Sequence, residues 1–334
     1  MLQRIIEQQY GISADEELQV GDYKAVKKNN ELYFVVPSSL SQEELAELDQ
    51  IARHLISAGD RYVSALVKTK TGQFVYESGG TPHCLLFYRQ RETDRQINIG
   101  RKLAKFHVRG RSLPFSVEKI SRIGQWKQLW EKRLEQMETV WNGKLIHQPD
   151  HEFDELFLDS FPYYMGLTEN AIQYLVDTEI DEQPTGADGG TVCHERFSET
   201  TWRKPLIKNP LDWTFDHPSR DLAEWTRNHY FHHTQTYQPG LKQFLQNYQT
   251  ISRLSPFAWR LLYARILFPL HYFDCVENYY TSSSEQQKHL LEDRFNKYLS
   301  QSGEYERFLG DFYQLAEVPV RRLSIPEPEW LKIH

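Results

Sequence analysis

Alternating and short apolar runs typical of β-strands occupy much of the first quarter of the chain. The segments with this pattern are residues 23–26, 32–36, 62–67, 73–76 and 84–88. Lys27-Lys28-Asn29-Asn30 separates the first two segments, and asparagine tolerates the positive φ of a tight hairpin turn. The pair at residues 71–72, Thr-Gly, separates the third and fourth segments. The pattern therefore predicts two hairpins within about five antiparallel strands.

One helix is predicted between these strands. Ser41 followed by Glu44 is a capping box, and Gly59 marks the end of the periodic segment. Apolar residues recur between these signals at the spacing of a helix, so we expect a helix over residues 41–57. Residues 1–91 are thus predicted to form an N-terminal lobe of a five-stranded sheet and one helix.

Helical periodicity dominates after residue 91. The predicted helices cover residues 96–107, 116–141, 153–160, 169–178, 221–233, 241–249, 256–280, 284–300 and 302–315. A short strand-and-loop region, residues 191–216, interrupts them. A small antiparallel-sheet lobe followed by a larger helical lobe, residues 92–334, is a two-lobed α+β fold, in which a cleft between the lobes is a usual place for a ligand.

Composition narrows the classes of protein that fit this pattern. The chain has 334 residues, 40% hydrophobic and 13% aromatic, and a net charge of −7. The chain is therefore predicted to fold, and it lacks the overall positive charge that would attract nucleic acids or anionic membranes. We expect no signal peptide, because the start MLQRIIEQQYG lacks an apolar core. We expect no transmembrane helix either, because charged residues and a proline interrupt the most apolar helical stretch, residues 259–280.

Three cysteines, Cys84, Cys193 and Cys275, lie far apart and form no CxxC pair. This spacing predicts neither a disulfide framework nor a cysteine zinc site, and it fits a reducing compartment. Cys193 precedes His194. Two roles are therefore open for Cys193: a thiol nucleophile, or a small buried residue of a strand. A histidine group at residues 229, 232 and 233 lacks further assignable zinc ligands, so a polar helix face is predicted there.

Three short sequence motifs after residue 91 carry a family resemblance. They are IGRKLAKFH at residues 99–107, VCH at 192–194 and DLAE at 221–224. In order and spacing the chain resembles the aminoglycoside phosphotransferase and choline kinase-like superfamily, more closely the spore-coat CotS family, and within it the YutH-type branch. The resemblance spans almost the whole chain and implies a two-lobed, protein-kinase-like fold.

The segment that corresponds to the family's catalytic loop lacks the family's catalytic groups. Residues 194–201, HERFSETT, stand where the family has His-Gly-Asp-aromatic-x-x-x-Asn. His194 matches, but Arg196 stands at the position of the catalytic aspartate and Thr201 at that of the magnesium-binding asparagine. A guanidinium stays protonated and does not act as a general base. Glu195 and Glu199 are the carboxylates left in the loop, either as replacement bases or as solvated surface charges.

The resemblance also bears on two aspartates. Asp212 is the match for the family's magnesium aspartate, with Asp216 as a competitor, because the interval to Asp221 is short for the family. One carboxylate rarely holds Mg²⁺ alone, so a structural role for Asp212 is the favoured alternative. Asp221 is predicted to be the N-cap of a helix, and the resemblance gives it a structural role in supporting the catalytic loop.

The nucleotide-binding features of the family are missing as well. The third strand of family members carries a lysine, whereas residues 32–37 read LYFVVP, and the glycine-rich loop is reduced to Gly21. Glu44 or Glu47 stands at the place of the helix glutamate that pairs with this lysine. We therefore expect no ATP and no metal to be bound.

Two main functional hypotheses follow from this pattern. The first is a catalytically degenerate kinase-like component of the bacterial spore coat, made in the mother-cell cytoplasm and assembled through contacts with other coat proteins; its oligomeric state stays open. The alternative is a divergent ATP- and Mg²⁺-dependent small-molecule phosphotransferase that uses Asp212 and either Glu195 or Glu199. A third possibility is a module that binds a small ligand without turning it over.

Overall fold

The computed structural model describes residues 2–21, 23–89, 98–146, 149, 151–202 and 206–331. The chain divides into two compact units, each built from three stretches of sequence. The first unit contains residues 1–123, 189–221 and 246–253, and the second contains the rest. The predicted lobe boundary at residues 91 and 92, and the predicted helix start at residue 96, lie outside the described residues.

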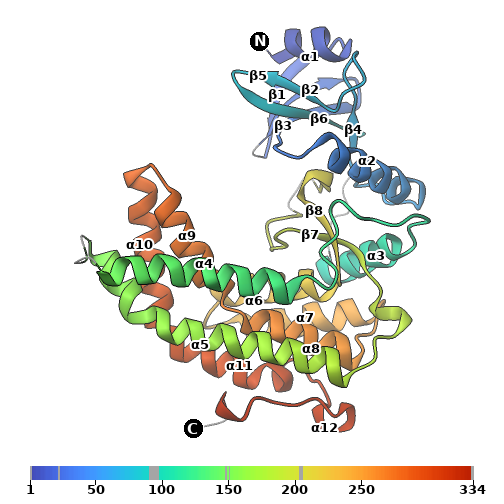
Figure 1. The fold of residues 1–334 in the computed structure, drawn as a ribbon. Helices are drawn as coiled ribbons and strands as arrows, with labels where there is room; N and C mark the ends of the chain where they lie inside the picture. The colour runs from blue at the N-terminus through green and yellow to red at the C-terminus, as the bar shows by residue number, and fades with distance from the viewer. Residues whose placement is uncertain are drawn as a thin grey trace. The chain divides into compact units, whose positions relative to one another are not determined.

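An antiparallel sheet forms the centre of the first unit (Figure 1). Its strands are β1 (Glu16–Val20), β2 (Tyr23–Lys28), β3 (Glu31–Pro37), β4 (Ala65–Val67), β5 (Val75–Ser78) and β6 (Thr81–Arg89). The order is β1-β2-β3-β6-β4, and β5 also pairs with β6. Asn29 has a φ of 55° in the β2–β3 turn, so the first predicted hairpin is confirmed.

Two helices cover this sheet on opposite sides (Figure 1). The first, α1 (Leu2–Tyr10), packs Ile6 and Tyr10 against Val26, Tyr33 and Leu85. The second, α2 (Gln42–Ser57), begins with the predicted capping box: the Ser41 hydroxyl accepts from the Glu44 N–H, and the Glu44 carboxylate accepts from the Ser41 N–H. The sequence pattern had indicated neither α1 nor β1.

The second predicted hairpin was wrong. Gly72 does make a turn, with a φ of 83° and its N–H donated to Thr69, but β4 and β5 do not pair with each other there. Both strands pair with β6 instead. A turn signal fixes the reversal of the chain and leaves the choice of strand partner to the rest of the sheet.

The first unit also contains α3 (Ile99–Arg111) and a two-stranded sheet of β7 (Thr191–His194) and β8 (Trp213–Asp216). The helix and β7 approach closely at Gly110. A Cβ atom there would lie 2.6 Å from Thr191 Oγ1 and 2.7 Å from the Val192 nitrogen. Glycine therefore sets the distance at which α3 packs on β7.

Helices make up the second unit. They are α4 (Trp126–Ile146), α5 (Glu152–Asp181), most of α6 (Ser219–His232) and α7 (Tyr237–Gln249), α8 (Pro256–Leu267), α9 (Leu270–Thr281), α10 (Glu285–Ser300), α11 (Ser302–Leu315) and α12 (Val320–Leu323). Stacked aromatic rings such as Phe153–Tyr279 and Tyr164–Tyr272 fill its core. Within the described part of the chain, no helix combines the length and apolar character needed to cross a membrane.

Helix α5 replaces two predicted helices, residues 153–160 and 169–178. It runs without interruption through Pro162, which lacks the N–H that would bond the Leu158 carbonyl. The Trp141 indole N–H of α4 donates to this carbonyl at 3.1 Å. A side chain from another helix thus supplies the hydrogen bond that the proline removes, so the helix continues.

Two other helix predictions were wrong in their extent. Residues 116–125 are not helical, because the Ile120 carbonyl accepts from the Phe215 N–H of β8 and the Arg122 N–H donates back to Phe215. The predicted helix over residues 256–280 is divided into α8 and α9 around Pro269, which lacks the donor needed to continue α8.

Candidate functional site

The segment between β7 and β8 corresponds to the predicted catalytic loop. The two strands pair over their whole length, from Thr191 opposite Asp216 to His194 opposite Trp213. The Glu195 N–H then donates to the Asp212 carbonyl at 2.8 Å, so both ends of the loop are fixed. The whole loop belongs to the first unit, together with the six-stranded sheet.

Asp221 is the buried acceptor that holds the start of this loop. Its side chain is fully buried, and its Oδ1 accepts the His194 backbone N–H at 2.8 Å. Its Oδ2 lies 2.7 Å from His194 Nδ1 and 3.1 Å from His107 Nε2. Although burial alone would raise the pKa of this carboxyl, the histidine contacts lower it below the usual value, so the group is ionised.

This ionised carboxylate fixes the tautomers of both histidines. A carboxylate only accepts hydrogen bonds, so His194 Nδ1 and His107 Nε2 carry protons. Burial lowers the pKa of His107, which is therefore neutral and accepts the Tyr248 hydroxyl at its Nδ1, 2.9 Å away. His194 Nε2 is buried and has no hydrogen-bond partner among the described residues.

The prediction that Asp221 is a helix N-cap was wrong. Helix α6 begins at Ser219, so Asp221 lies within its first turn. Its carboxylate turns towards His194 and His107 instead of the free N–H groups of α6. From the sequence, the start of a helix is uncertain by one or two residues, so an N-cap aspartate and a first-turn aspartate look alike. The contact with His194 at the end of β7 shows that Asp221 is the second kind.

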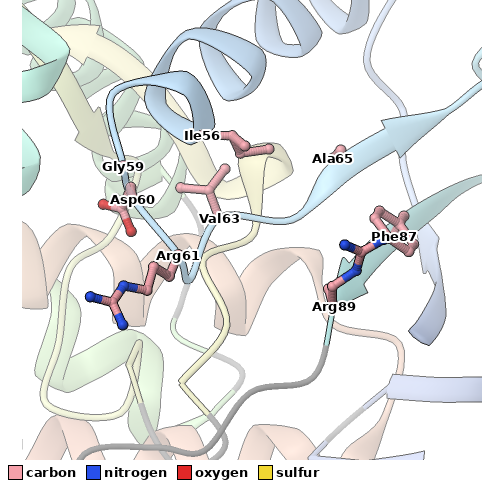
Figure 2. A pocket seen from close by; sticks show the side chains of 8 residues that line it. All are labelled: Ile56, Gly59, Asp60, Arg61, Val63, Ala65, Phe87 and Arg89. Atoms are coloured by element: carbon pink, nitrogen blue, oxygen red, sulfur yellow. The ribbon is translucent and has the colours of Figure 1, made fainter. Parts of the chain in front are cut away.

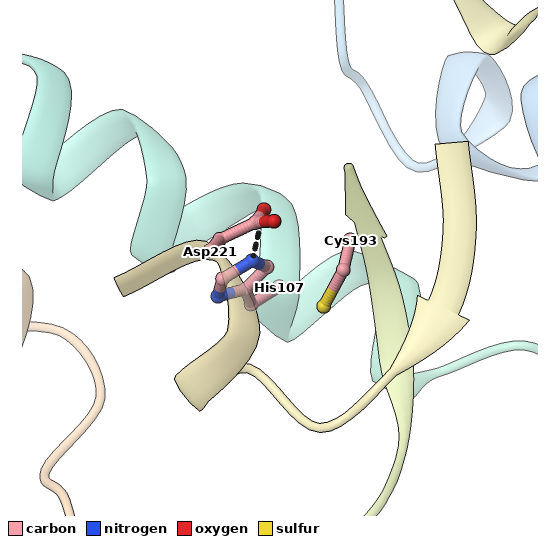
Figure 3. A group of neighbouring side chains, drawn as sticks. All are labelled: His107, Cys193 and Asp221. Atoms are coloured by element: carbon pink, nitrogen blue, oxygen red, sulfur yellow. Dashed lines mark hydrogen bonds and ion pairs between the residues drawn. The ribbon is translucent and has the colours of Figure 1, made fainter. Parts of the chain in front are cut away.

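Cys193 lies beside this network (Figure 3). A ligand atom from each of His107, Cys193 and Asp221 lies within 4.8 Å of the others, and all three residues are buried. The Cys193 thiol lies 3.6 Å from the Asp216 carbonyl and 3.5 Å from the His217 carbonyl, which makes it a hydrogen-bond donor. Hydrogen bonds thus account for the arrangement of this group, and Cys193 is a small buried strand residue without the features of a nucleophile.

Arg196 and Thr201 are used within the loop itself. Arg196 is exposed, and its Nη1 donates to the Glu195 carbonyl at 3.0 Å. Thr201 Oγ1 accepts the Ser198 N–H at 2.9 Å, and the Thr201 N–H donates to the Ser198 carbonyl. The loop therefore closes on a local turn around residues 198–201, in which the threonine hydroxyl takes part.

Arg220 is a central residue that the sequence pattern did not indicate. Its guanidinium is buried and donates to the His194 carbonyl at 2.9 Å, to Asp216 Oδ2 at 2.9 Å and to Glu195 Oε2 at 2.8 Å. Asp216, the competitor for the magnesium position, is thus in a buried ion pair. Glu195, a candidate replacement base, is held by a cation as well, although its side chain is half exposed.

Asp212 differs from these two carboxylates. It ends a short 3₁₀ turn, η2 (Pro210–Asp212), that Asn209 caps through the Leu211 N–H. Its side chain reaches solvent and has no ion pair among the described residues. The surrounding protein raises the pKa of its carboxyl, while nearby His194 opposes that rise. Its side chain keeps contact with water, so Asp212 is an accessible carboxylate.

The sheet side of the site has an apolar surface where the family has its lysine. Leu32, Phe34 and Val36 point to the same face of β3, and all three are buried. Tyr23 of β2 packs its ring edge-on against Phe34, and its hydroxyl lies 3.4 Å from Asn209 Nδ2. This face thus offers an aromatic contact towards η2 and no ammonium group.

The candidate helix glutamates have other roles. Glu44 is occupied in the capping box. Glu47 accepts the backbone N–H groups of Glu118, Lys119 and Ile120 at 2.8, 2.9 and 2.9 Å. Its carboxylate therefore holds the segment between α3 and α4 that pairs with β8, which was predicted to be helical.

The histidines at residues 229, 232 and 233 do not share one polar face. His229 is buried, stacks on Trp225 and lies 3.0 Å, through Nε2, from the Tyr237 carbonyl. His232 is exposed, and its Nδ1 donates to the Asn228 carbonyl of the preceding turn. The prediction of a polar face thus holds for His232 and was wrong for His229.

A family model described as "Spore coat putative kinase YutH" matches residues 3–312. The endospore coat-associated protein YutH of Bacillus subtilis strain 168 is 42% identical over 334 residues, which is 99% of this chain and 98% of that protein. These two matches confirm the resemblance predicted from the sequence phrases.

Solved structures with the same fold include phosphotransferases. An aminoglycoside phosphotransferase from Alicyclobacillus acidocaldarius has a TM-score of 0.65 at 15% identity, over 94% of this chain and 96% of that chain. The AMP-bound complex of a spectinomycin phosphotransferase has a TM-score of 0.59 at 13% identity, over 95% and 98%. At such low identity the likeness shows the fold alone, and it confirms the predicted kinase-like α+β class.

Proposed function

This chain belongs to the YutH family of spore coat proteins, and from that membership we propose that it is a coat component with a kinase-like fold that no longer transfers phosphate. Its role would be to bind other coat proteins. It would be made in the mother-cell cytoplasm and assembled on the forespore surface.

The observation that carries the loss of catalysis is the engagement of the loop's polar groups in structural contacts. Phosphoryl transfer needs a carboxylate for the acceptor hydroxyl, two metal-holding groups and a cation for the phosphates. At the loop positions that correspond, Arg196 is a cation, Thr201 closes a turn, and the substitute Glu195 pairs with Arg220. The apolar face of β3 offers no ammonium group for a phosphate.

One observation favours the alternative, a divergent Mg²⁺- and ATP-dependent phosphotransferase. The Asp212 carboxylate is accessible to solvent and lies beside the loop. With ATP present, phosphate oxygens would complete the coordination that one carboxylate leaves open. Glu195 or Glu199 would then have to act as the base.

Thermal unfolding with nucleotide separates the two functions. A ligand at one hundred times its Kd stabilises the folded state by about 2.7 kcal/mol, which raises Tm by several degrees. We expect no rise for the full-length protein with millimolar ATP and Mg²⁺, whereas an active aminoglycoside phosphotransferase treated in the same way should show one. A clear rise here, or ATP turnover that Asp212→Asn abolishes, would establish the alternative.

The coat role is tested in spores. A fluorescent fusion of the chain should surround the developing spore, and Asp212→Asn should assemble equally well, because assembly would not require catalysis. Failure of the wild-type fusion to reach the coat would contradict a coat role. Failure of a folded Asp212→Asn variant alone would indicate that activity is needed.

A further inference from the structure

The first unit contains a pocket at the end of α2 that the proposed loss of catalysis leaves unexplained (Figure 2). Its volume is about 590 Å³. We call it the α2–β4 pocket; it is lined by Ile56, Gly59, Asp60, Arg61, Val63, Ala65, Phe87 and Arg89. Half of these residues come from α2, β4 and the end of β6, and the other half come from the loop between α2 and β4.

Asp60, the one acid among the described residues that line the pocket, is already paired with cations. The Asp60 carboxylate is buried and accepts Lys208 Nζ at 2.7 Å and Arg109 Nη1 at 3.2 Å. Lys208 is itself buried, and its ammonium lies 4.5 Å from the centre of the Phe106 ring and 4.4 Å from that of Trp202. Two cations thus face one carboxylate behind the pocket wall, which leaves a local positive charge in a chain whose net charge is −7.

Two further cations belong to the pocket lining. Arg61 is exposed and has no ion pair among the described residues. Arg89 pairs with Glu31 at 3.3 Å, but its side chain is 63% exposed. Such a surface pair contributes less than about 1 kcal/mol, so a carboxylate from another molecule can replace Glu31 at little cost.

Between these cations the wall is apolar. Val63, Ala65 and Phe87 contribute aliphatic and aromatic surface, and Ile56 is 41% exposed although it is a large hydrophobic residue. Apolar surface flanked by guanidinium groups suits a ligand that presents a hydrophobic group and an anion side by side. Arginine beside apolar contacts is also frequent at the centres of protein interfaces.

We propose that the α2–β4 pocket binds a segment of a partner coat protein in which a large apolar side chain lies next to a carboxylate. This inference rests on the proposed function, because it identifies the surface through which the coat contact is made. A protein segment fits better than a nucleic acid, because the site has few exposed cations and offers an apolar wall that a phosphate backbone would not use.

An unbiased peptide selection tests this proposal. The full-length protein is immobilised and used to select from random peptides displayed on phage, and the selected peptides are then labelled with fluorescein and titrated. We expect the selected peptides to carry Asp or Glu within two positions of Leu, Ile, Phe or Trp. Replacing the acid with its amide should weaken binding at least about tenfold, which corresponds to 1.4 kcal/mol.

Variants identify the binding site. Arg61→Glu should weaken binding of the selected peptides at least about tenfold, and Ile56→Ser and Arg89→Gln should each weaken it several-fold. Lys105→Glu is the matched control, because Lys105 is exposed on α3 in the same unit and does not line the pocket. It should leave the affinity unchanged. The unfolding free energy of each variant establishes that it is folded.

Several outcomes would overturn the proposal. They are no enrichment of any peptide, enrichment of peptides without acids, and equal effects of Arg61→Glu and Lys105→Glu. Competition by a random oligonucleotide that depends on Arg61 would assign the pocket to nucleic acid instead.

If the wild type assembles on spores but any of these results is found, the pocket proposal fails and the coat function stands. If acidic peptides bind through Arg61 but the fusion never reaches the coat, the coat function fails and the pocket stands.

Discussion

At residue scale, Asp221 combines an ionised carboxylate with complete burial. Three N–H groups, from the His194 backbone and from the His194 and His107 rings, satisfy its oxygens. Asp221→Asn keeps the shape but turns the amide NH₂ either towards the His194 backbone N–H or towards the two ring N–H groups. Removing one partner of a buried charge network typically costs several kcal/mol, so we expect a loss of about 3 kcal/mol in the unfolding free energy, measured with urea at pH 7.

The control for this change is Asp212→Asn. Asp212 is exposed and has no ion pair among the described residues, so its unfolding free energy should change by less than about 0.5 kcal/mol. Equal losses in the two variants would show that the histidine network does not stabilise the fold.

His271 gives a prediction for the pH dependence of stability. It is buried in the second unit against Tyr164, Phe231, Tyr298 and Tyr305, and burial together with Arg227 lowers its pKa well below 6.5. Below pH 6.5 the unfolded chain therefore binds a proton at His271 that the folded chain does not bind. The contribution of neutral His271 to the unfolding free energy is complete above pH 6.5 and is lost as pH falls below it. The slope reaches at most about 1.4 kcal/mol per pH unit.

The replacement His271→Phe removes this titration and keeps a ring in place. Between pH 7 and pH 5 the wild type should lose about 1–2 kcal/mol more unfolding free energy than the variant, as measured by urea unfolding at both pH values. Parallel losses in the two proteins would contradict the assignment to His271.

At element scale, close approach of α3 and β7 depends on one missing methyl group. Gly110→Ala would place a Cβ within 2.7 Å of the Val192 backbone nitrogen, so the helix or the strand has to move. We expect a loss of about 3 kcal/mol in unfolding free energy.

Gly143→Ala in α4 is the matched control, because no atom lies within 4 Å of its added Cβ. It should stabilise the protein by roughly 0.5–1 kcal/mol, since alanine favours helix. Similar effects at both positions would contradict this close packing.

At the scale of the whole molecule, the first unit is discontinuous in sequence. Its sheet comes from the first 89 residues, but β7, β8 and residues 246–253 return to it from much later in the chain. Tyr248 bonds His107, and Thr191 Oγ1 donates to the His107 carbonyl at 2.7 Å. A fragment of residues 1–123 therefore loses the partners of α3, and we expect it to unfold without a cooperative transition, measured by circular dichroism in urea. A sigmoidal transition would show that the first 123 residues form an independent domain.

Local signals in the sequence determined the elements whose ends depend on their own residues. Ser41 and Glu44 begin α2, and Asn29 forms the turn between β2 and β3, because capping and turn chemistry act within four residues. The three short phrases at residues 99–107, 192–194 and 221–224 were enough to identify the family and the fold. The arginine at position 196 and the absence of lysine from residues 32–37 are likewise read from the sequence.

Only the tertiary structure decided which group replaces the hydrogen bond missing at Pro162 and which groups the carboxylates contact. Trp141 donates to the carbonyl that Pro162 leaves free, so α5 continues where the sequence predicts an end. Arg220 pairs with Glu195 and Asp216, and Glu47 accepts three backbone N–H groups. Asp212 is exposed and has no ion pair among the described residues. Most of these partners lie between 17 and 73 positions apart in the sequence, and Asp216 and Arg220, four positions apart, lie in different elements. The spacing of residues along a chain carries no information about contacts of that kind.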